Sequence, residues 1–416
     1  MNLNLAAVVF MLPTSALTAP LDDSALEAKA RAIHEKVITL DTHVDISLDF
    51  ATAAADPGGF TEGQVDLPKM RAGGLDAAFF IVYTPQGPLT DDGFLNAQEI
   101  ALTRLGAIHR FVGAYPNEIG LAFSAAGARE VAKSGRKVAL IGMENAFPLG
   151  PDPTEAEIER IAAEGVRYVG ITHFGHNQFG DSSNPDVENG DVEEKWGGLS
   201  PKGRALISML NRAGIIVDVS HSSRKTMMQA IELSAAPIIA SHSGVKAVAD
   251  SPRNLDDEQL KALAANGGVV QIVALDVYVK ALNDAQKAFQ EKVRKEMGLE
   301  TSAARAAMSA EVKADYENRM KDLWTISARA TVADFVDHID HAVKVAGIDH
   351  VGIASDFDGG GGIVGWDNAS ETLNVTRELV KRGYSEEEIA KLWSGNLLRV
   401  LTRVEKAAVS LRRSGR

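Results

Sequence analysis

The sequence predicts an α/β protein: a (β/α)8 barrel of the TIM type with a helical insertion after its seventh strand. Eight short apolar, β-branched runs alternate along the chain with stretches that have the 3.6-residue periodicity of amphipathic helices. Several of these runs are hydrophobic without interruption, which is typical of parallel strands buried on both faces. The length of 416 residues also fits, because such barrels have about 250 residues and exceed 400 with insertions.

Strands and helices are expected in regular alternation within one domain at residues 22–405. The predicted strands cover residues 37–45, 77–83, 138–144, 168–173, 215–221, 238–243, 269–273 and 351–358. The predicted helices cover residues 22–36, 93–115, 154–164, 201–213, 223–233, 256–265 and 332–346. This order favours a parallel sheet that closes into a barrel. An open, doubly wound sheet is the alternative with the same alternation.

Two segments are too long to be simple connections. Residues 280–330 are charged and rich in Ala, Lys, Glu and Met, a composition that favours helices. We expect a helical insertion near the mouth of the barrel, either a lid or oligomer contact or a solvated hairpin without a function. Residues 175–198 form a loop rich in Gly, Asp and Asn, and long loops after barrel strands tend to shape the active site.

The composition excludes several classes of partner and of site. Apolar residues make up 45% and charged residues 24% of the chain, which is ordinary for a folded domain. The formal net charge of −13 argues against a nucleic-acid partner, which needs basic clusters. The chain has no cysteine, so disulfides and thiolate metal sites are excluded. Any metal ion must be held by His, Asp or Glu.

Residues 1–19 resemble a secretory signal peptide. Residues 5–19 carry no charge, begin apolar and end in small residues, so cleavage is expected near Ala16. This predicts a periplasmic or secreted protein. No Lys or Arg precedes the apolar run, and the alternative is an apolar tail or a misplaced start codon on a cytoplasmic protein. The run is too short to cross a bilayer and no other approaches that length, so no integral membrane span is expected.

Ionisable side chains lie at or near the ends of six predicted strands. His43 and Asp45 close the first strand as His-x-Asp, which places both side chains on one face. The others, in chain order, are Glu144, His173, His221, His242 and Asp356. In a barrel these strand ends form the rim where chemistry occurs. A single His there is more often structural, but so many buried acids and imidazoles would repel one another or stay unsatisfied without a cation.

A metal centre is therefore expected at this rim. The expected ligands are His43, Asp45, Glu144, His221 and His242. Three imidazoles and two carboxylates suit zinc or another first-row ion. They exceed the needs of one tetrahedral zinc with an open position, whereas two ions that share a bridging carboxylate account for all five ligands. Glu144 lies between the two pairs in chain order and is the expected bridge. Two ions about 3.5 Å apart would lower the pKa of a shared water and polarise a carbonyl.

Longer segments resemble the membrane (renal) dipeptidase family of zinc peptidases, over roughly residues 30–405. The matching segments are DTHVDI at 41–46, QVDLPKMRAGGLDAAFF at 64–80, IGMEN at 141–145, RYVGITHFGHN at 167–177, GLSPKGRALISMLNRAGIIVDVSHSS at 198–223, PIIASHSGVKAVADSPRN at 237–254, HIDHAVKVAGIDHVGIASDFDG at 338–359 and GNLLRV at 395–400. Their order, spacing and chemical character agree throughout, so the resemblance does not depend on any single short motif.

The resemblance implies an enzyme that hydrolyses dipeptides, including those with a C-terminal D-residue, by a hydroxide that bridges two Zn²⁺ ions. His43 and Asp45 would hold one zinc, His221 and His242 the other, and Glu144 would bind both. The resemblance also assigns His173 to the substrate and its developing oxyanion, Arg253 to the substrate carboxylate, Asp356 to proton transfer from water to the leaving amine, and Tyr278 to substrate contact. A guanidinium suits that carboxylate because it can donate two parallel hydrogen bonds.

The sequence is also compatible with other functions. The same metal pair could serve an esterase, a lactonase or an N-acyl-amino-acid hydrolase. A phosphotriester hydrolase is less compatible because no predicted strand ends in Lys. A non-catalytic metal-binding protein is the alternative from another class. The sequence does not define the preferred substrate side chains, the native metal or whether a homodimer forms.

Individual residues also have alternative roles. Arg253 could pair on the surface with Asp250, Asp256 or Asp257, and Asp358 could replace Asp356 in proton transfer. The remaining histidines are His176, His338, His341 and His350, none of which is expected to bind metal. His338 and His341 lie three residues apart on a predicted helix, which more often indicates packing against a barrel. Asp218 has no assigned role.

Overall fold

The computed structural model describes residues 22–187, 190–300, 304, 305 and 308–414. The predicted signal peptide at 1–19 lies outside the described residues. No helix in the described part of the chain is long and apolar enough to cross a membrane.

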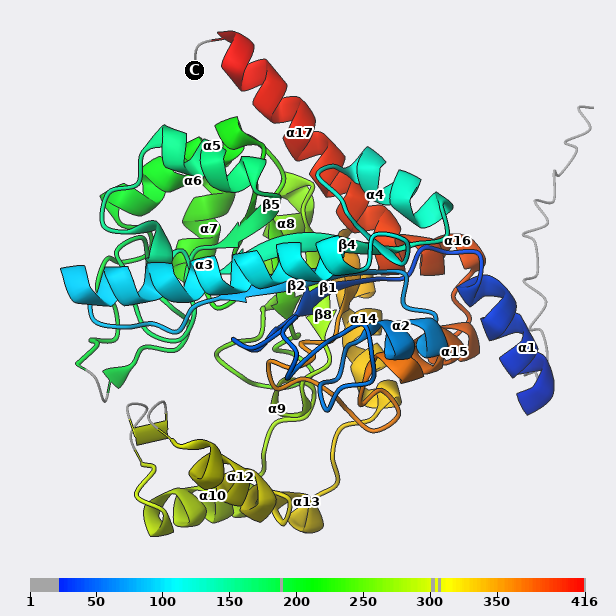
Figure 1. Ribbon diagram of the computed structural model, residues 1–416. Helices are drawn as coiled ribbons and strands as arrows, with labels where there is room; N and C mark the ends of the chain where they lie inside the picture. The colour runs from blue at the N-terminus through cyan, green and yellow to red at the C-terminus, as the bar shows by residue number, and fades with distance from the viewer. Residues whose placement is uncertain (1–21, 188–189, 301–303, 306–307, 415–416) are drawn as a thin grey trace, which may run out of the picture.

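Eight parallel strands form a nearly closed barrel in the order β1-β2-β4-β5-β6-β7-β8-β9 (Figure 1). They are β1 Leu40–Val44, β2 Ala77–Tyr83, β4 Lys137–Glu144, β5 Val166–Gly170, β6 Ile216–Asp218, β7 Ile239–Ser243, β8 Val269–Val273 and β9 Val351–Ala354. The barrel closes where Val44 bridges Phe357 and the Asp45 N–H donates to the Phe357 carbonyl at 2.8 Å. The predicted barrel is thus confirmed. A short additional strand, β3 (Ile119–Leu121), pairs with β4 outside the barrel order.

Helices cover the outside of the barrel. They are α1 Asp23–His34, α2 Leu67–Gly73, α3 Asp91–Ala114, α4 Ala125–Lys133, α5 Glu155–Ala163, α6 Pro201–Ala213, α7 Arg224–Leu233, α8 Asp257–Asn266, α14 Val332–Ala346, α15 Leu373–Lys381, α16 Glu386–Ala390 and α17 Asn396–Ser414. Local sequence sets many of their ends: Ser200 caps α6 before Pro201, and Gly214 ends it with a φ of 78°. The prediction omitted α2, α4 and the last three helices.

Alternate strand residues divide the core into two layers. One cluster joins Leu40, Phe79, Leu140, Tyr168, Ile216, Ile239 and Val269 from seven strands with Leu397, Leu401 and Val404 of α17. A larger cluster joins the opposite strand faces to the surrounding helices, with Phe80, Ile141, Val169, Val217 and Val270 as examples. The period-two alternation of a strand explains this division. Most of these residues are fully buried, so the strand ends are held on a rigid frame.

The predicted insertion after the seventh barrel strand is helical and projects from the barrel below the other helices in Figure 1. The helix α9 (Asp276–Val279) leads into it, and the helices in its described part include α10 Asp284–Glu296, α12 Ala310–Met320 and α13 Leu323–Ile326. Val293, Leu299 and Leu323 are buried within it. The Asp276 carboxylate accepts hydrogen bonds from Arg329 Nε and the Ala330 N–H, both at 2.7 Å, and so ties the two ends of the insertion together.

Candidate active site

The five expected metal ligands meet at the carboxyl ends of the barrel strands. His43 lies in β1 with Asp45 just after it, Glu144 ends β4, and His242 lies in β7. His221 follows β6 by three residues with a left-handed backbone, at a φ of 63°. All but Asp45 are buried, and four of the five, all but His43, line a cavity of about 1330 Å³.

Glu144 lies between two pairs of these residues, and each of its oxygens faces a different pair. Oε2 lies 3.5 Å from His43 Nε2, and this histidine is 3.7 Å from Asp45 Oδ2. Oε1 lies 3.1 Å from His221 Nε2 and 3.3 Å from His242 Nε2. Two groups of three potential ligands therefore share one carboxylate, and within each group the atoms lie within 4.8 Å of one another. This is the arrangement that a bridging carboxylate requires.

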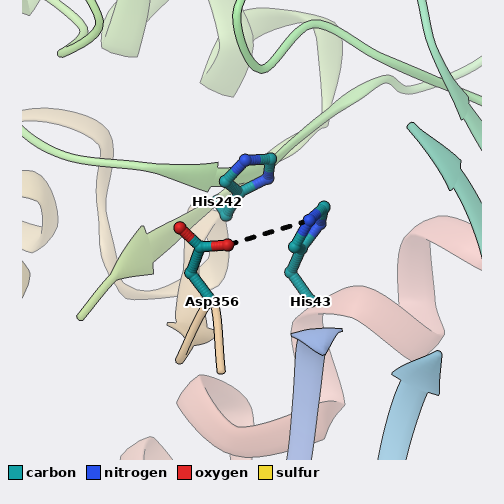
Figure 2. Close-up of side chains that lie close together, drawn as sticks. All are labelled: His43, His242 and Asp356. Atoms are coloured by element: carbon teal, nitrogen blue, oxygen red, sulfur yellow. Dashed lines mark ion pairs between the residues drawn. The ribbon is translucent and has the colours of Figure 1, made fainter. Parts of the chain in front are cut away.

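Asp356 extends the cluster on one side. It follows β9 with a φ of 60°, and its Oδ1 lies 3.9 Å from His43 Nε2. Figure 2 shows Asp356, which follows β9, lying close to His43 of β1 and His242 of β7. These three residues form another group whose ligand atoms lie within 4.8 Å of one another. The geometry therefore permits Asp356 either to transfer a proton beside the metal centre or to bind an ion itself.

Several polar atoms of the expected ligands are buried without a hydrogen-bond partner among the described residues. They are His43 Nε2, Asp45 Oδ1, Glu144 Oε1 and His221 Nδ1. Leaving such atoms unpaired is costly, on the order of 1–3 kcal/mol each. Cations between them would satisfy several at once, and oxygen and imidazole donors without thiolate suit zinc and other divalent first-row ions. The residues present therefore fit a metal centre.

The protonation states also favour metal binding. Burial lowers the pKa of His221 and of His242 well below the usual range, so both imidazoles are neutral. Burial alone would raise the pKa of Glu144, but His173 and His43 outweigh it and hold this pKa well below its usual range. Burial would lower the pKa of His43, but Glu144 and Asp45 raise it well above its usual value. The carboxylates that favour a proton on His43 Nε2 equally favour a cation there.

Tyr168 determines which nitrogen of His43 faces the cluster. Its hydroxyl donates to the Thr42 carbonyl at 3.1 Å and lies 2.9 Å from His43 Nδ1. The hydroxyl proton is thereby used, so Tyr168 accepts a hydrogen bond from the Nδ1–H of His43, and Nε2 is the nitrogen that faces the other ligands. Gly142 makes room for this tyrosine, since a Cβ there would lie 2.2 Å from the ring.

Ser241 and Asp218 orient His242 in the same way. Ser241 Oγ donates to Asp218 Oδ2 at 2.8 Å and lies 2.8 Å from His242 Nδ1. Asp218 is held in turn by the Ser220 and Ser241 N–H groups. This relay leaves His242 Nε2 as the nitrogen that faces Glu144. The sequence analysis assigned no role to Asp218 and did not predict that Tyr168 orients His43. The only local indication of such a contact was the serine directly before His242.

The predicted substrate residues lie around the cluster. His173 lines the cavity, 3.9 Å from Glu144 Oε1, and burial lowers its pKa. Arg253 is 2% exposed and donates to Ser243 Oγ at 2.7 Å and to the His242 carbonyl at 2.5 Å. Its Nε has no partner among the described residues, and its guanidinium lies 5.6 Å from the ring of Tyr278. Tyr278 lines the cavity, whereas Arg253 is not among the lining residues.

The proposed surface pairing of Arg253 is not present. The three nearby acids bind other partners: Asp250 lies 3.6 Å from Lys246, Asp256 lies 2.9 Å from Arg224, and Asp257 lies 2.7 Å from His341. Asp358 also lines the cavity, but its side chain accepts from the Gln64 N–H at 2.8 Å, and it belongs to none of the three potential metal groups.

The outer wall of the cavity differs from the sequence-based expectation. None of the described residues of the 175–198 loop, which are 175–187 and 190–198, is among the lining residues. That loop binds itself instead, as Asp181 accepts from the N–H groups of Lys195, Trp196 and Gly198. The wall is formed mainly by residues 45–63, which follow β1, together with Lys313 and Glu317 of α12. The insertion therefore contributes to the mouth of the cavity, as expected, whereas the 175–198 loop does not shape the cavity wall as the sequence predicted.

A family model described as membrane dipeptidase (peptidase family M19) matches residues 27–415. The chain belongs to the membrane dipeptidase family. The resemblance seen in the sequence is thus confirmed, and the chain is a metallopeptidase, a hydrolase that acts on dipeptides.

Individual relatives agree with this assignment. The crystal structure of the "probable dipeptidase PvdM" from Pseudomonas aeruginosa is 34% identical, covers 93% of this chain and 100% of that one, and has a TM-score of 0.83. "Dipeptidase ataJ" from Aspergillus terreus is 30% identical over 366 residues, 83% of this chain and 78% of its own length. A metallopeptidase from Rhodobacter sphaeroides, solved with a phosphinate mimic of L-Ala-D-Ala, is 24% identical, covers 88% of this chain and 99% of that one, and at a TM-score of 0.66 shares the fold.

Proposed function

We propose that this member of the membrane dipeptidase family uses two divalent ions, with zinc as the expected metal. His43 and Asp45 would hold one ion, His221 and His242 the other, and Glu144 both. The observation that carries this proposal is the division of the Glu144 oxygens, of which Oε2 faces His43 and Oε1 faces His221 and His242. When bound, such an ion pair activates a water molecule and polarises a carbonyl.

The protein's own residues would position the substrate and move its protons. His173 lies beside Glu144 on the cavity wall and would donate a hydrogen bond to the carbonyl oxygen as negative charge develops there. Asp356 Oδ1 would accept the proton released by the attacking water and deliver it to the departing nitrogen. Burial raises the pKa of Asp356 well above its usual range, which favours its holding a proton between these two events.

Substrate length would be set by Arg253. A buried guanidinium with a free Nε, next to Tyr278, suits the C-terminal carboxylate of a peptide. Arg253 donates to the carbonyl of the expected ligand His242, so a carboxylate bound by Arg253 would belong to the residue directly after the scissile bond. We therefore propose dipeptides as substrates, including those with a C-terminal D-residue, as the family resemblance implies.

The test is a panel of L–L and L–D dipeptides, assayed with metal-replete protein and after treatment with a chelator. Turnover that disappears with chelation and returns with zinc is expected, together with two equivalents of metal in the purified protein. No turnover of any dipeptide by the metal-replete protein would refute the activity. One equivalent of metal would refute Glu144 as a bridge.

Asp356→Asn separates two roles of Asp356. If Asp356 transfers a proton, the variant keeps both metals and loses turnover by about 10²- to 10⁴-fold, the usual contribution of general acid–base catalysis. Loss of metal from the variant would instead make Asp356 a ligand. Asp358→Asn is the matched control, because Asp358 lines the same cavity but belongs to none of the potential metal groups.

A further inference from the structure

Arg104 is a half-buried cation in the wall of the active-site cavity. It projects from α3 and donates from Nε to the Ile46 carbonyl at 3.0 Å and from Nη1 to the Tyr83 carbonyl at 2.8 Å. Its guanidinium lies 5.4 Å from the centre of the Tyr83 ring. Among the described residues no carboxylate forms an ion pair with Arg104, and its Nη2 makes no hydrogen bond.

This arrangement repeats that of Arg253 on the opposite side of the rim. Each arginine lies over a cavity-lining tyrosine, at 5.4 Å for Arg104 with Tyr83 and 5.6 Å for Arg253 with Tyr278. Tyr83 ends β2, whereas Arg253 follows β7. In the order of the eight barrel strands β2 is second and β7 is sixth, so the two arginines lie across the ring from each other, with the metal ligands between them.

A bound dipeptide would extend between these two arginines. Under the proposed function, its C-terminal carboxylate binds Arg253 and its scissile carbonyl lies beside Glu144 and His173. The N-terminal residue then extends toward the β2 side, where the ring of Tyr83 lies 4.8 Å from that of His173. We propose that Arg104 binds an anionic side chain on the N-terminal residue, so that the enzyme prefers dipeptides that begin with Glu or Asp. This inference rests on the proposed function.

The charges and the size of the cavity support such a substrate. Burial lowers the pKa of Arg104, and the carboxylates of Asp45 and Glu144 offset this only in part; a carboxylate from the substrate would compensate the charge through Nη2. The nearby acids Asp45 and Glu144 are assigned to metal. Exposed acids at the mouth, such as Asp49 and Glu62, are in contact with water, which screens them. At about 1330 Å³ the cavity exceeds the roughly 300–1,000 Å³ of ordinary small-ligand pockets, so it has room for a long side chain.

A purely structural role for Arg104 makes a different prediction. If Arg104 only holds the carbonyls of Ile46 and Tyr83 in place, its loss would damage the site for every substrate alike. If it binds substrate, its loss would act on acidic substrates in particular. The informative quantity is therefore the ratio of kcat/KM for Glu-Ala to that for Gln-Ala, because these two dipeptides have nearly the same shape and differ in charge.

The experiment measures this ratio for the wild-type protein, Arg104→Gln and Arg104→Lys. We expect a wild-type ratio of about 10 to 100, the usual range for hydrogen bonds to a charged group. The ratio should fall to near one in Arg104→Gln, mainly through KM for Glu-Ala, and be intermediate in Arg104→Lys, which keeps the charge but loses the planar fork. The wild-type ratio should also decrease as salt is added.

Arg110→Gln is the matched control. Arg110 lies on the same helix and also donates to loop carbonyls, those of Ala51 and Phe50, but it does not line the cavity. Its ratio should equal that of the wild type. If the wild-type protein hydrolyses both dipeptides with a ratio near one, the inference about Arg104 is overturned and the proposed function is upheld. This outcome needs only the wild-type protein, so it holds even if Arg104→Gln fails to fold. An equal loss on both substrates in Arg104→Gln makes Arg104 structural and also overturns the inference. No hydrolysis of either dipeptide would overturn both.

Discussion

At the scale of single residues, the hydrogen bond between Tyr168 and His43 can be tested through metal affinity. Tyr168→Phe removes the acceptor for the Nδ1 proton, so the imidazole can turn or change tautomer and present less of its Nε2 lone pair to the ion. We expect affinity for zinc to fall by about 10- to 100-fold, the usual effect of losing such a partner. Competition with a chelator of known affinity measures this directly, without an activity assay.

Tyr384→Phe is the control for Tyr168→Phe. The Tyr384 hydroxyl donates to Asp340 Oδ1 at 2.7 Å, on the outside of the barrel. Both changes remove one phenol hydroxyl, and each should lower the free energy of unfolding by about 1 kcal/mol. Only Tyr168→Phe should weaken zinc binding. Equal zinc affinity in the two variants would show that Tyr168 serves packing and not the orientation of His43.

The residue types in the sequence identified the expected ligands. The sequence did not reveal which side chains hydrogen-bond to those ligands and orient them. His43, Glu144 and His242 follow apolar runs, so the strand pattern alone placed them at the rim. Tyr168 and Asp218 lie inside predicted strands, where an aromatic or a lone acid usually packs in the core or faces solvent. Tyr168 meets His43 of β1, which is not adjacent to β5 in the barrel, and Asp218 meets Ser241 of the adjacent β7. Both contacts depend on the register of the strands around the barrel. A single sequence does not specify this register.

At the scale of elements, the same limit explains the errors at strand ends. The prediction extended the strands through His221 and to Asp358, but β6 ends at Asp218 and β9 at Ala354. The chain turns there: His221, Asp356 and Asp358 have φ values of 63°, 60° and 61°. Non-glycine residues in this conformation are uncommon and occur where the surroundings hold them. Apolar periodicity predicts that a strand is present, but not where its last residues turn toward a site.

His338 of α14 connects two elements of the predicted substrate site. Its Nδ1 accepts from the Val245 N–H at 2.9 Å, so its Nε2 carries the proton and donates to the Val279 carbonyl at 2.9 Å. The first contact holds the segment that leads from β7 to Arg253, and the second holds the end of α9, next to Tyr278. A second proton on the ring would break the bond from Val245.

This contact predicts a loss of stability in mild acid. Burial lowers the pKa of His338 in the folded protein below its ordinary value of 6.5, so below that pH the unfolded chain binds more protons than the folded one. The stabilising contribution is complete above pH 6.5 and decreases as the pH falls through the folded pKa, by at most about 1.4 kcal/mol per pH unit. Unfolding of metal-saturated protein from pH 7.5 to 5 should be less steeply pH-dependent in His338→Gln than in the wild type. Parallel curves would contradict this.

At the scale of the whole molecule, the barrel was predictable because it depends on a repeated pattern. Apolar runs such as 77–83 and 269–273 became strands with the predicted bounds, and α6 and α14 also match residue for residue. The cavity wall at 45–63 was not predictable. That segment has no regular periodicity, and its place over the site follows from the closure between Val44 and Phe357.

The sequence predicts one domain at 22–405 in which residues 280–330 are an insertion outside the barrel. Deleting this insertion tests that prediction. Replacing residues 281–327 with a short Gly/Ser linker should leave the barrel folded, because Asp276 still holds Arg329 and Ala330 next to it. The buried residues Val293, Leu299 and Leu323 are removed together, so no cavity opens in the barrel core. Metal content should be unchanged, as no residue of the three potential metal groups lies in the insertion.

Activity of this shortened protein should decrease through substrate binding. Lys313 and Glu317 of α12 line the outer cavity, so their removal opens the site to water, and we expect KM to rise by up to about tenfold, or 1.4 kcal/mol, with a smaller change in kcat. The double variant Lys313→Ala/Glu317→Ala, which keeps the insertion, should show part of the same rise. Loss of metal or of cooperative unfolding in the shortened protein would instead show that residues 280–330 are an integral part of the barrel domain, because an excursion that only covers the mouth cannot affect either property.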